Sequence, residues 1–465
     1  MLTYNIESRG NIPIYVHLYN CIKSDIIKGV IKPDEKLPSK RNLAEHLKVS
    51  IMTVQNAYMQ LLSEGYIYSR VKSGYFAEAL EGNNYTADYK KTEIQDTPPN
   101  NDEYFIDFCE NSISIDKFPF SVLAKQMREV LCEYSSELLR KIPNSGALKL
   151  RKAISDFLYQ FRGMSVSPEQ VIIGAGTEYL YGLLVKLLGK DKIYAVEDPG
   201  YKKIAEIYKS ENVICRHIGL DKYGISSKEL NNSDADIVHI SPSHHFPTGI
   251  VMPIKRRQEL LSWANDKADR YIIEDDYDSE FRFIGKAIPT MQSIDTKGKV
   301  IYINTFSKTI SPSIRISYMV LPYNLLTKFK EELGFYSCTV SSFEQYTLAG
   351  FIENGYFERH INRMRKEYKL KRDFIIKTIK SSIPRGRAEI LEENSGLHFI
   401  MKLKTDMSDK EIVYRAKING IKISCLSQYC FKQDNIGKSM VIINYSGINI
   451  EFAQKAIDIL ARIIS

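Results

Sequence analysis

Apolar residues recur at helical spacing along the first part of the chain. The segment before Gly29 predicts one helix, because its apolar residues fall on one face. Two further helices are predicted over KRNLAEHL, capped by Ser39, and over IMTVQNAYMQLLSEG, capped by Ser50. Two strand-like runs, YIYSRV and GYFAEA, follow as a hairpin. The predicted apolar faces of the first and third helices consist of Tyr15, Leu18, Tyr19, Ile22, Ile26, Ile51, Val54, Ala57, Tyr58, Leu61 and Leu62.

From residue 104 onward, helical segments alternate with short apolar runs of strand length. These runs include QVIIGAG, KIYAVEDPG, ADIVHISPS, RYIIEDDYD and VIYINTFSK. Such alternation predicts an α/β domain with a doubly wound sheet and with ligand sites at the carboxyl ends of its strands. The part from about 350 to 465 mixes charged helices with strands and predicts a smaller α+β subdomain.

The domain division follows from these patterns. Residues 1–78 form the predicted helical domain and residues 104–465 the predicted α/β domain. Residues 79–103 hold few aliphatic side chains and include Pro98 and Pro99, so they are predicted to be a linker.

Composition narrows the class of protein. With 465 residues, 44% apolar and 26% charged, the chain is typical of a globular protein of two or three domains. Its seven scattered cysteines form no CxxC pair, which predicts reduced thiols and no metal site. A signal segment and a membrane-spanning apolar run are both lacking, so a cytoplasmic location without membrane contact is predicted. The net charge of +8 permits a polyanion as a partner.

Polar and basic side chains in the helical domain are suited to DNA. Thr53, Gln55 and Asn56 lie outside the apolar stripe of the third helix, where they could reach base edges in the major groove. A second group could contact phosphates at the start of the second helix and at the hairpin tip: Ser39, Lys40, Arg41, Arg70 and Lys72. A helical protein-interaction module with a basic edge is the alternative.

A family resemblance favours DNA. The run from KLPSKRNLAEHL to KSGYF resembles the winged helix-turn-helix domain of GntR-family repressors, which implies double-stranded operator DNA as a partner. Ile51 departs from the pattern, because many members carry an arginine there. Tyr58 is a phosphate neighbour in some members, but its place in the apolar stripe predicts core packing here.

The strand ends of the α/β domain supply the groups that pyridoxal phosphate requires: a lysine for the aldehyde, an acid on the pyridine nitrogen, a donor to the ring hydroxyl and anion binders. Asp275 and Tyr277 end one strand, and Lys308 follows the next. Further candidates, for the phosphate and for stacking on the ring, are Thr305, Ser307, Arg315, Gly176, Thr177 and Tyr201. Taken singly, the SK dipeptide, the DDYD run and the GAGT turn are also compatible with surface or loop positions.

The order of these motifs is more specific than any one of them. GAGT, EDPGY, SPSHHFPTG, EDDYD, FSK and IR follow one another over some 140 residues, and the series resembles the fold type I aminotransferases. The resemblance makes Lys308 the Schiff-base lysine, Asp275 the pyridine acid and Tyr277 the ring-hydroxyl partner. It also makes Thr305 and Arg315 phosphate contacts. His244 and His245 are expected to shape the pocket rather than to act as acid-base groups.

A GntR-like head joined to such a body resembles the MocR/GabR family of regulators. The resemblance implies that the large domain senses a small-molecule effector and that the chain forms a head-to-tail homodimer. Aminotransferases hold the substrate carboxylate with a late arginine, but here the matching stretch reads VIINYSGINIEF. Lys203 follows EDPGY in place of an arginine, and a lysine lacks the planar fork of a guanidinium.

Three functions therefore remain open from the sequence. The chain is a regulator that senses pyridoxal phosphate itself and controls vitamin B6 genes, or a regulator of amino acid or amine metabolism whose effector reacts with the Schiff base at Lys308. The third possibility is an active aminotransferase with a DNA-binding tether. The missing carboxylate clamp favours a regulator without catalytic turnover.

Overall fold

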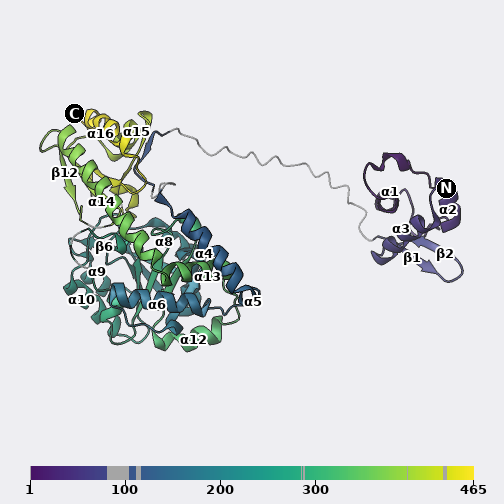
Figure 1. Cartoon of the computed structure of the whole chain (residues 1–465), viewed down its shortest axis with the longest axis horizontal. Helices are drawn as coiled ribbons and strands as arrows, with labels where there is room; N and C mark the ends of the chain where they lie inside the picture. The colour runs from purple at the N-terminus through teal and green to yellow at the C-terminus, as the bar shows by residue number, and fades with distance from the viewer. Residues whose placement is uncertain are drawn as a thin grey trace. The chain divides into compact units, whose positions relative to one another are not determined.

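The computed structural model describes residues 2–80, 104–110, 117–283, 285, 288–394, 396–432 and 437–464. Two compact units divide the chain, an N-terminal unit (Met1–Asn100) and a large unit (Asn101–Ser465), as Figure 1 shows. The predicted linker 79–103 lies outside the described residues apart from Ala79 and Leu80.

The N-terminal unit contains the predicted three helices and the hairpin. Ser39 and Ser50 accept hydrogen bonds from the backbone N–H groups of Asn42 and Thr53, so both predicted caps are confirmed. Tyr58 is fully buried, as predicted. The elements are η1 (Ile6–Arg9), α1 (Ile14–Ile27), α2 (Lys40–Leu47), α3 (Ile51–Ser63), β1 (Ile67–Arg70) and β2 (Gly74–Ala77).

Three residues of the predicted apolar faces are not in this core. Tyr15 and Leu62 are more than a third exposed, and Ile51 is 48% exposed. Ile51 and Leu62 lie at the flank of the α3 stripe, where helix rotation carries the side chain away from the buried face. Tyr15 lies on the buried side of α1 but is only its second residue, in the first turn. The prediction was wrong for these three positions and right for the others.

An eight-stranded sheet organises the large unit, with strand order β4-β11-β10-β9-β8-β5-β6-β7. The strands β10, β9, β8, β5 and β6 are parallel, whereas β11 runs antiparallel to both β4 and β10. The strands are β4 (Val171–Gly174), β5 (Ile193–Asp198), β6 (Ile214–Asp221), β7 (Gly224–Ile225), β8 (Ile237–Ile240), β9 (Tyr271–Asp276), β10 (Val300–Thr305) and β11 (Ser317–Val320).

Helices cover both faces of this sheet, as the predicted doubly wound fold requires. Successive strand residues point to opposite faces, so Ile301 packs in a cluster with α7 and α12 while Tyr302 packs with α6 and α13. The helices are α4 (Phe120–Glu133), α5 (Ser135–Leu138), α6 (Leu148–Arg162), α7 (Thr177–Leu188), α8 (Lys202–Ser210), α9 (Ser227–Asn231), α10 (Ile254–Asn265), α11 (Met291–Ile294), α12 (Tyr323–Leu333) and α13 (Ser342–Glu353). Short 3-10 helices are η3 (Pro168–Gln170), η4 (Ser279–Phe281), η5 (Pro312–Ile314) and η6 (Leu426–Tyr429).

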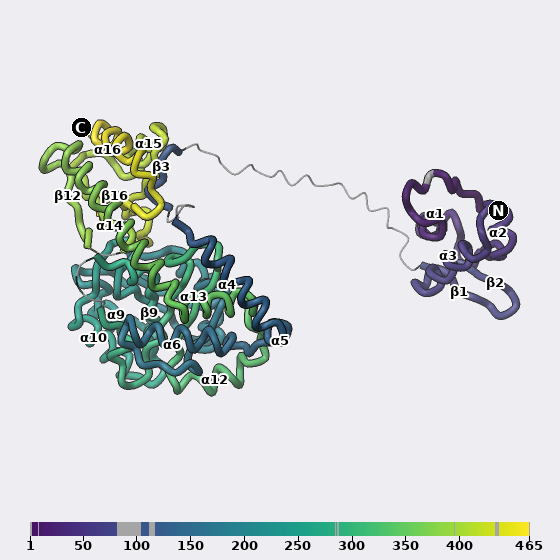
Figure 2. Tube along the Cα trace, in the orientation of Figure 1, coloured from purple at the N-terminus to yellow at the C-terminus, as the bar shows by residue number. Residues whose placement is uncertain are grey.

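A small subdomain surrounds a four-stranded antiparallel sheet of order β12-β13-β16-β15. The long helix α14 packs in this subdomain, and β3, from the start of the unit, also lies here (Figure 2). β3 pairs in parallel with β14. Ile106 and Phe108 are buried in the core of the subdomain. The sequence interpretation placed only residues from about 350 here, and it missed this early segment. The elements are β3 (Ile106–Asp107), α14 (Tyr356–Ser382), β12 (Ala388–Leu391), β13 (His398–Leu403), α15 (Asp409–Ile418), β14 (Ile421–Lys422), β15 (Ser424–Cys425), β16 (Met440–Asn444) and α16 (Ile450–Ile464).

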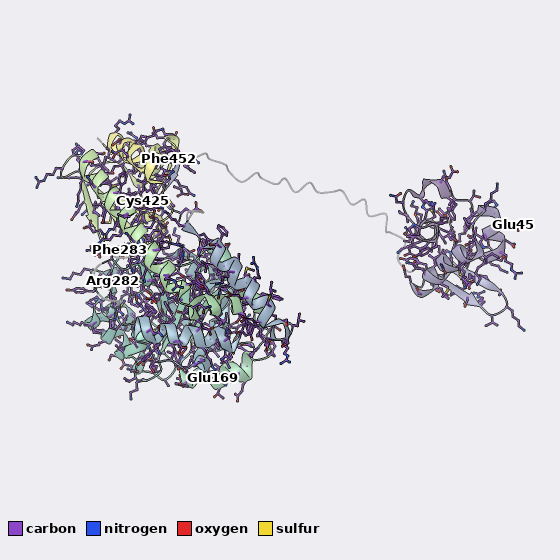
Figure 3. All side chains as sticks on the ribbon, in the orientation of Figure 1. Glu45, Glu169, Arg282, Phe283, Cys425 and Phe452 are labelled. Atoms are coloured by element: carbon purple, nitrogen blue, oxygen red, sulfur yellow. The ribbon has the colours of Figure 1, made fainter. Side chains whose placement is uncertain are left out.

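The chain beyond β9 connects the sheet to the small subdomain. Arg282 and Phe283 follow η4 and lie where the two parts of the large unit meet (Figure 3). The Phe283 ring packs 4.6 Å from the Arg372 guanidinium and 6.3 Å from the Tyr445 ring. The short segment that follows β9 therefore packs against α14 and against Tyr445, the residue directly after β16.

Candidate functional site

The candidate cofactor residues come from the carboxyl ends of adjacent parallel strands. In the register of β9 and β10, Asp275 lies opposite Ile303, so the chain after each strand leaves the sheet at the same edge. Tyr277 and Asp278 follow β9, and Lys308 follows β10. Burial lowers the pKa of Lys308, and the nearby carboxylate of Asp278 opposes that shift. A lysine with a lowered pKa is the form that condenses with an aldehyde.

Asp275 is held by hydrogen-bonding groups on one side and is free on the other. The Tyr181 hydroxyl donates to Asp275 Oδ2, and Nε2 of His239 lies 3.5 Å from the same oxygen. The Tyr208 hydroxyl lies 2.7 Å from Nδ1 of His239. When this hydroxyl donates to Nδ1, the proton of the neutral ring is on Nε2, which faces Asp275. Oδ1 of Asp275 is buried and has no hydrogen-bond partner in the described part of the chain. This oxygen fits a protonated pyridine nitrogen.

Tyr277 is placed as a proton donor. Burial raises the pKa of Tyr277 well above its usual value, and the carboxylates of Asp278 and Asp275 raise it further. Its hydroxyl lies 3.2 Å from Nδ1 of His244. The hydroxyl therefore keeps its proton at neutral pH, as a hydrogen bond to a ring oxygen requires.

An anion site is built at the start of α7. Gly176 precedes the helix with φ 91°, and a Cβ there would lie 2.5 Å from a terminal nitrogen of Arg315, so this close approach requires glycine. Arg315 has φ 50° and pairs with Glu178 at 3.2 Å. Thr177 is the first helical residue, where backbone N–H groups favour an anion. The arrangement fits a phosphate between the helix start and the guanidinium.

The other phosphate and effector candidates are engaged by protein groups. The Thr305 hydroxyl accepts hydrogen bonds from the Ser307 backbone N–H at 3.1 Å and from the Ser317 hydroxyl at 2.8 Å. Lys203, the candidate effector contact, forms an ion pair with Glu178. The cations Lys203 and Arg315 lower the pKa of Glu178. Glu178 therefore joins the candidate effector and phosphate residues in one ion-pair chain. Tyr201 caps α8 and is 49% exposed, with its ring centroid 5.9 Å from that of Phe246.

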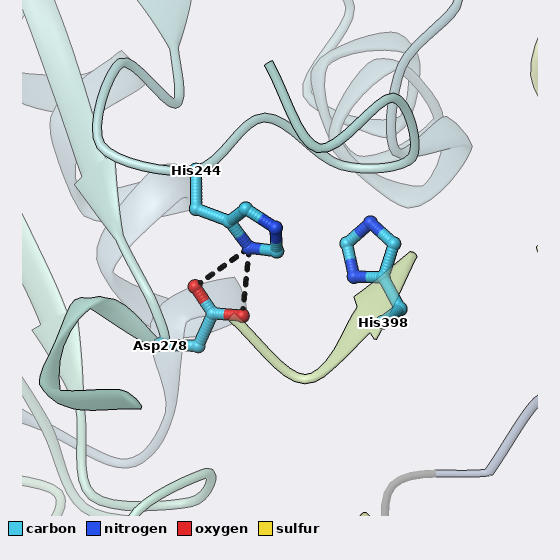
Figure 4. Close-up of side chains that lie close together, drawn as sticks. All are labelled: His244, Asp278 and His398. Carbon is cyan, nitrogen blue, oxygen red and sulfur yellow. Dashed lines mark hydrogen bonds and ion pairs between the residues drawn. The ribbon is translucent and has the colours of Figure 1, made fainter. Parts of the chain in front are cut away.

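Beside Lys308 lies a buried cluster of His244, Asp278 and His398 (Figure 4). Their candidate ligand atoms lie within 4.8 Å of one another, a grouping that the sequence did not predict. Nδ1 of His244 is 2.9 Å from Asp278, and Nε2 of His398 is 3.1 Å from the Pro247 carbonyl. Burial lowers the pKa of His398 far below its usual value, with Lys308 among the smaller causes. These residues form a buried polar cluster close to Lys308.

His245 faces a second buried acid. Its Nε2 lies 3.4 Å from Oε2 of Glu197, and the Ser241 backbone N–H donates to that oxygen at 3.0 Å. Burial lowers the pKa of His245 to about 3 and raises the pKa of Glu197 to about 8. Both groups are therefore uncharged at neutral pH. Both histidines are buried, and their role in shaping the pocket stays a prediction.

Replacing Glu197 by glutamine should flatten the pH dependence of stability. The folded-state pKa of about 8 lies above the ordinary 4.5, so the stabilisation from the bound proton is complete below about pH 4.5 and is lost as the pH rises towards 8. Each unit of pKa shift corresponds to about 1.4 kcal/mol. The free energy of unfolding of the large unit, measured with urea, should fall between pH 5 and pH 8. We expect this fall to be smaller in the variant than in wild type by about 3 kcal/mol.

Glu206→Gln makes the same chemical change on the exposed surface of α8 and serves as the control. It should leave the pH slope unaltered. The pKa values of buried Glu274 and Glu280 are each raised to about 7. These two groups therefore keep part of the pH dependence of stability in both variants. Identical slopes for Glu197→Gln and wild type would show that Glu197 is ionised in the folded protein.

The candidate DNA contacts lie on α2, α3 and the hairpin. Arg41 and Asn56 are exposed, and Lys40 donates to Gln55 at 3.4 Å. The Thr53 hydroxyl is 2.8 Å from that of Ser50 in the cap of α3. Arg70 pairs with Asp34 at 3.2 Å and packs over Phe76. Lys72 has φ 60° in the turn between β1 and β2.

Several residues of the site were not found from the sequence. Tyr181, His239, Glu178, Asp278 and His398 all contact residues that lie far away along the chain. A sequence signal existed for one of them, since His239 interrupts an otherwise apolar buried strand. Tyr181 and Glu178 are ordinary helix residues in the sequence.

Comparison with known families defines the class of protein. Residues 103–438 match the family model of aminotransferase class I and II, and residues 14–76 match that of the bacterial regulatory proteins of the gntR family. The crystal structure of kynurenine aminotransferase from Pyrococcus horikoshii is similar, with a TM-score of 0.68 and 24% identity, covering 78% of this chain and 91% of that one. The chain therefore combines a GntR-type DNA-binding domain with a fold type I aminotransferase-like domain, a fold that implies dependence on pyridoxal phosphate.

Relatives that match most of the chain narrow the family. The uncharacterized HTH-type transcriptional regulator YdeL of Bacillus subtilis is 40% identical over 89% of each chain. The pyridoxine biosynthesis transcriptional regulator PdxR of Corynebacterium glutamicum is 27% identical over 88% of this chain and 87% of that protein. The chain belongs to the MocR/GabR family of transcription regulators and is a DNA-binding regulator. Among the described residues, none of the helices is long and apolar enough to span a membrane.

Proposed function

We propose that this regulator holds pyridoxal phosphate on Lys308 and uses it to sense a small molecule in the cytoplasm. Asp275 receives the pyridine nitrogen, Tyr277 donates to the ring hydroxyl, and Tyr201 stacks on the ring. Arg315 and the amides of Gly176 and Thr177 hold the phosphate, with Ser307 and Thr305 beside it. The main support for this proposal is the buried Oδ1 of Asp275. It has no hydrogen-bond partner among the described residues, whereas Oδ2 accepts a hydrogen bond from Tyr181.

The bound cofactor supplies an electrophilic carbon that captures primary amines. The protein groups prepare this capture. Burial keeps the Lys308 amine uncharged for a larger share of the time, and the carboxylate of Asp278 stabilises the charge when a proton is present. Asp275, held by the Tyr181 hydroxyl and close to His239, would keep a proton on the ring nitrogen. Tyr277 keeps its hydroxyl proton, because buried carboxylates oppose its ionisation.

The effector is the cofactor itself or an amine that displaces Lys308. The stretch from Arg415 to Arg462 contains no intervening arginine in the sequence, which disfavours bidentate capture of an amino acid carboxylate. The name of PdxR supports the cofactor as the signal. Tyr201 also lines a cavity of about 450 Å³ whose wall holds aromatic side chains, such as Tyr429, and charged ones, such as Lys209.

Sensing requires two arrangements of a homodimer that bind the effector with different affinities, because a ligand shifts an equilibrium only by its differential binding. A head-to-tail dimer supplies such arrangements, since each DNA-binding head then responds to the body of the other chain.

The decisive experiment titrates pyridoxal phosphate and candidate amines against operator binding. Full-length protein is used with the DNA upstream of its own gene, and affinity is measured by fluorescence anisotropy and footprinting. Saturating ligand should change the DNA affinity by about 5- to 150-fold, the usual range of allosteric coupling. Lys308→Ala should bind DNA but lose the response, whereas Lys299→Ala should keep it. Tight DNA binding by wild type that ignores every ligand would refute the sensor function.

A further inference from the structure

The recognition helix α3 exposes apolar side chains in its first turn. Ile51 is 48% and Met52 is 62% exposed. Successive helix residues are rotated by about 100°, so Met52 and Asn56 lie on the side opposite to the buried face. That buried face consists of Val54, Ala57, Tyr58 and Leu61. Two apolar side chains thus stand beside the polar residues proposed to read bases.

Basic side chains at the start of α2 lie near this part of α3. Lys40 lies in the first turn of α2 and donates to Gln55, which is one turn of α3 beyond Ile51. Arg41 is exposed next to Lys40. A cationic rim favours a polyanion over an apolar protein surface as the occupant. The occupant must also offer apolar groups to the first turn of the helix.

Thymine in the major groove meets both conditions. It presents a C5 methyl group there, and side chains of suitable length contact it without a hydrogen bond. Residues near the N-terminus of a recognition helix are those that reach base edges. The side-chain amide of Asn56 can accept one hydrogen bond from an adenine and donate another to it. Each adenine of the duplex is paired with a thymine.

We propose that Ile51 and Met52 contact thymine methyl groups and set the operator preference of this regulator. The inference rests on DNA binding by the GntR-type domain and adds the base class that is read. An arginine at position 51 would favour guanine through its two donors, whereas isoleucine has no polar atom. The half-site should therefore carry A·T pairs opposite the first turn of α3.

The test removes single methyl groups from the DNA. An operator is first selected from random DNA with the full-length protein, and each thymine is then replaced by deoxyuridine, which lacks only the C5 methyl. Burial of one methyl group corresponds to about a fourfold change in affinity. Anisotropy titrations should show that loss at one or two thymines of each half-site and little change at the others.

Protein variants assign the effect to residues. Met52→Ala and Ile51→Ala should each bind with equal affinity to the thymine and deoxyuridine forms at one sensitive position. Met59→Ala is the matched control, because Met59 is also 57% exposed on α3 but lies two turns from the helix start. It should keep the full discrimination. Ile51→Arg should shift the selected base at its position towards guanine.

The outcomes separate this inference from the proposed function. Failure to select any DNA would refute operator binding itself. If an operator is selected but its affinity is unchanged by deoxyuridine at every thymine, only the contact with thymine methyl groups is overturned. Discrimination that survives in both alanine variants, or that disappears in Met59→Ala, would overturn the assignment to Ile51 and Met52. A change in oligomeric state of Met52→Ala without loss of discrimination would identify a protein contact instead.

Discussion

Lys308→Ala is expected to yield a colourless protein that no longer retains pyridoxal phosphate after desalting. The covalent bond to the lysine gives the family its visible absorption, and alanine cannot form it. We expect cofactor affinity to fall by about a hundredfold or more, which corresponds to about 2.7 kcal/mol. Absorption spectra and equilibrium dialysis of full-length protein measure both effects.

Borohydride reduction provides an independent readout. It fixes the cofactor on the lysine that carries it, and peptide mapping of wild type should locate the label at Lys308. Lys299→Ala is the control, since burial also lowers the pKa of Lys299 but its amine donates to backbone carbonyls of Lys267 and Ala268. A label at another lysine, or a yellow Lys308→Ala protein, would refute the proposed attachment.

The strands that carry the site could be predicted because their signals are local. Asp275 and Lys308 each follow a continuous apolar run, and parallel strands of a doubly wound sheet end at one edge. The strand β6 was missed because its burial alternates weakly and it contains Arg216 and His217. The strand β11 was not among the predicted runs; it is only four residues long and begins two residues after Arg315.

The partners of the site residues could not be predicted, because they depend on packing between distant segments. Tyr181 reaches Asp275 across 94 positions of the chain, and helix α7 gives no sign of which side chain points at β9. Likewise, periodicity put Ile51 with the core stripe of α3, although a residue in the first turn at the edge of that stripe has no helix packed over it. Local pattern predicts elements, whereas contacts across the sheet require the fold.

Arg162→Leu is expected to destabilise the large unit by about 3 to 5 kcal/mol. Arg162 ends α6, and its guanidinium lies 2.5 Å from Oδ2 of Asp276, which also accepts from the Tyr302 hydroxyl at 2.8 Å. Both charged side chains are almost fully buried. Removing the arginine leaves the carboxylate of Asp276 uncompensated in a medium of low dielectric, which is the costly way to break a buried pair.

The double variant Arg162→Leu/Asp276→Asn decides whether charge or packing causes that loss. Neutralising the orphaned carboxylate should recover a large part of the lost free energy of unfolding, measured with urea on the transition of the large unit. Arg216→Ala, which breaks an exposed pair with Asp234, should cost less than about 1 kcal/mol. Equal stability of the single and double variants would assign the loss to packing of α6. Because Asp276 directly follows Asp275, recovery in the double variant would show that Arg162 compensates a buried charge at the end of the strand that carries the proposed cofactor acid.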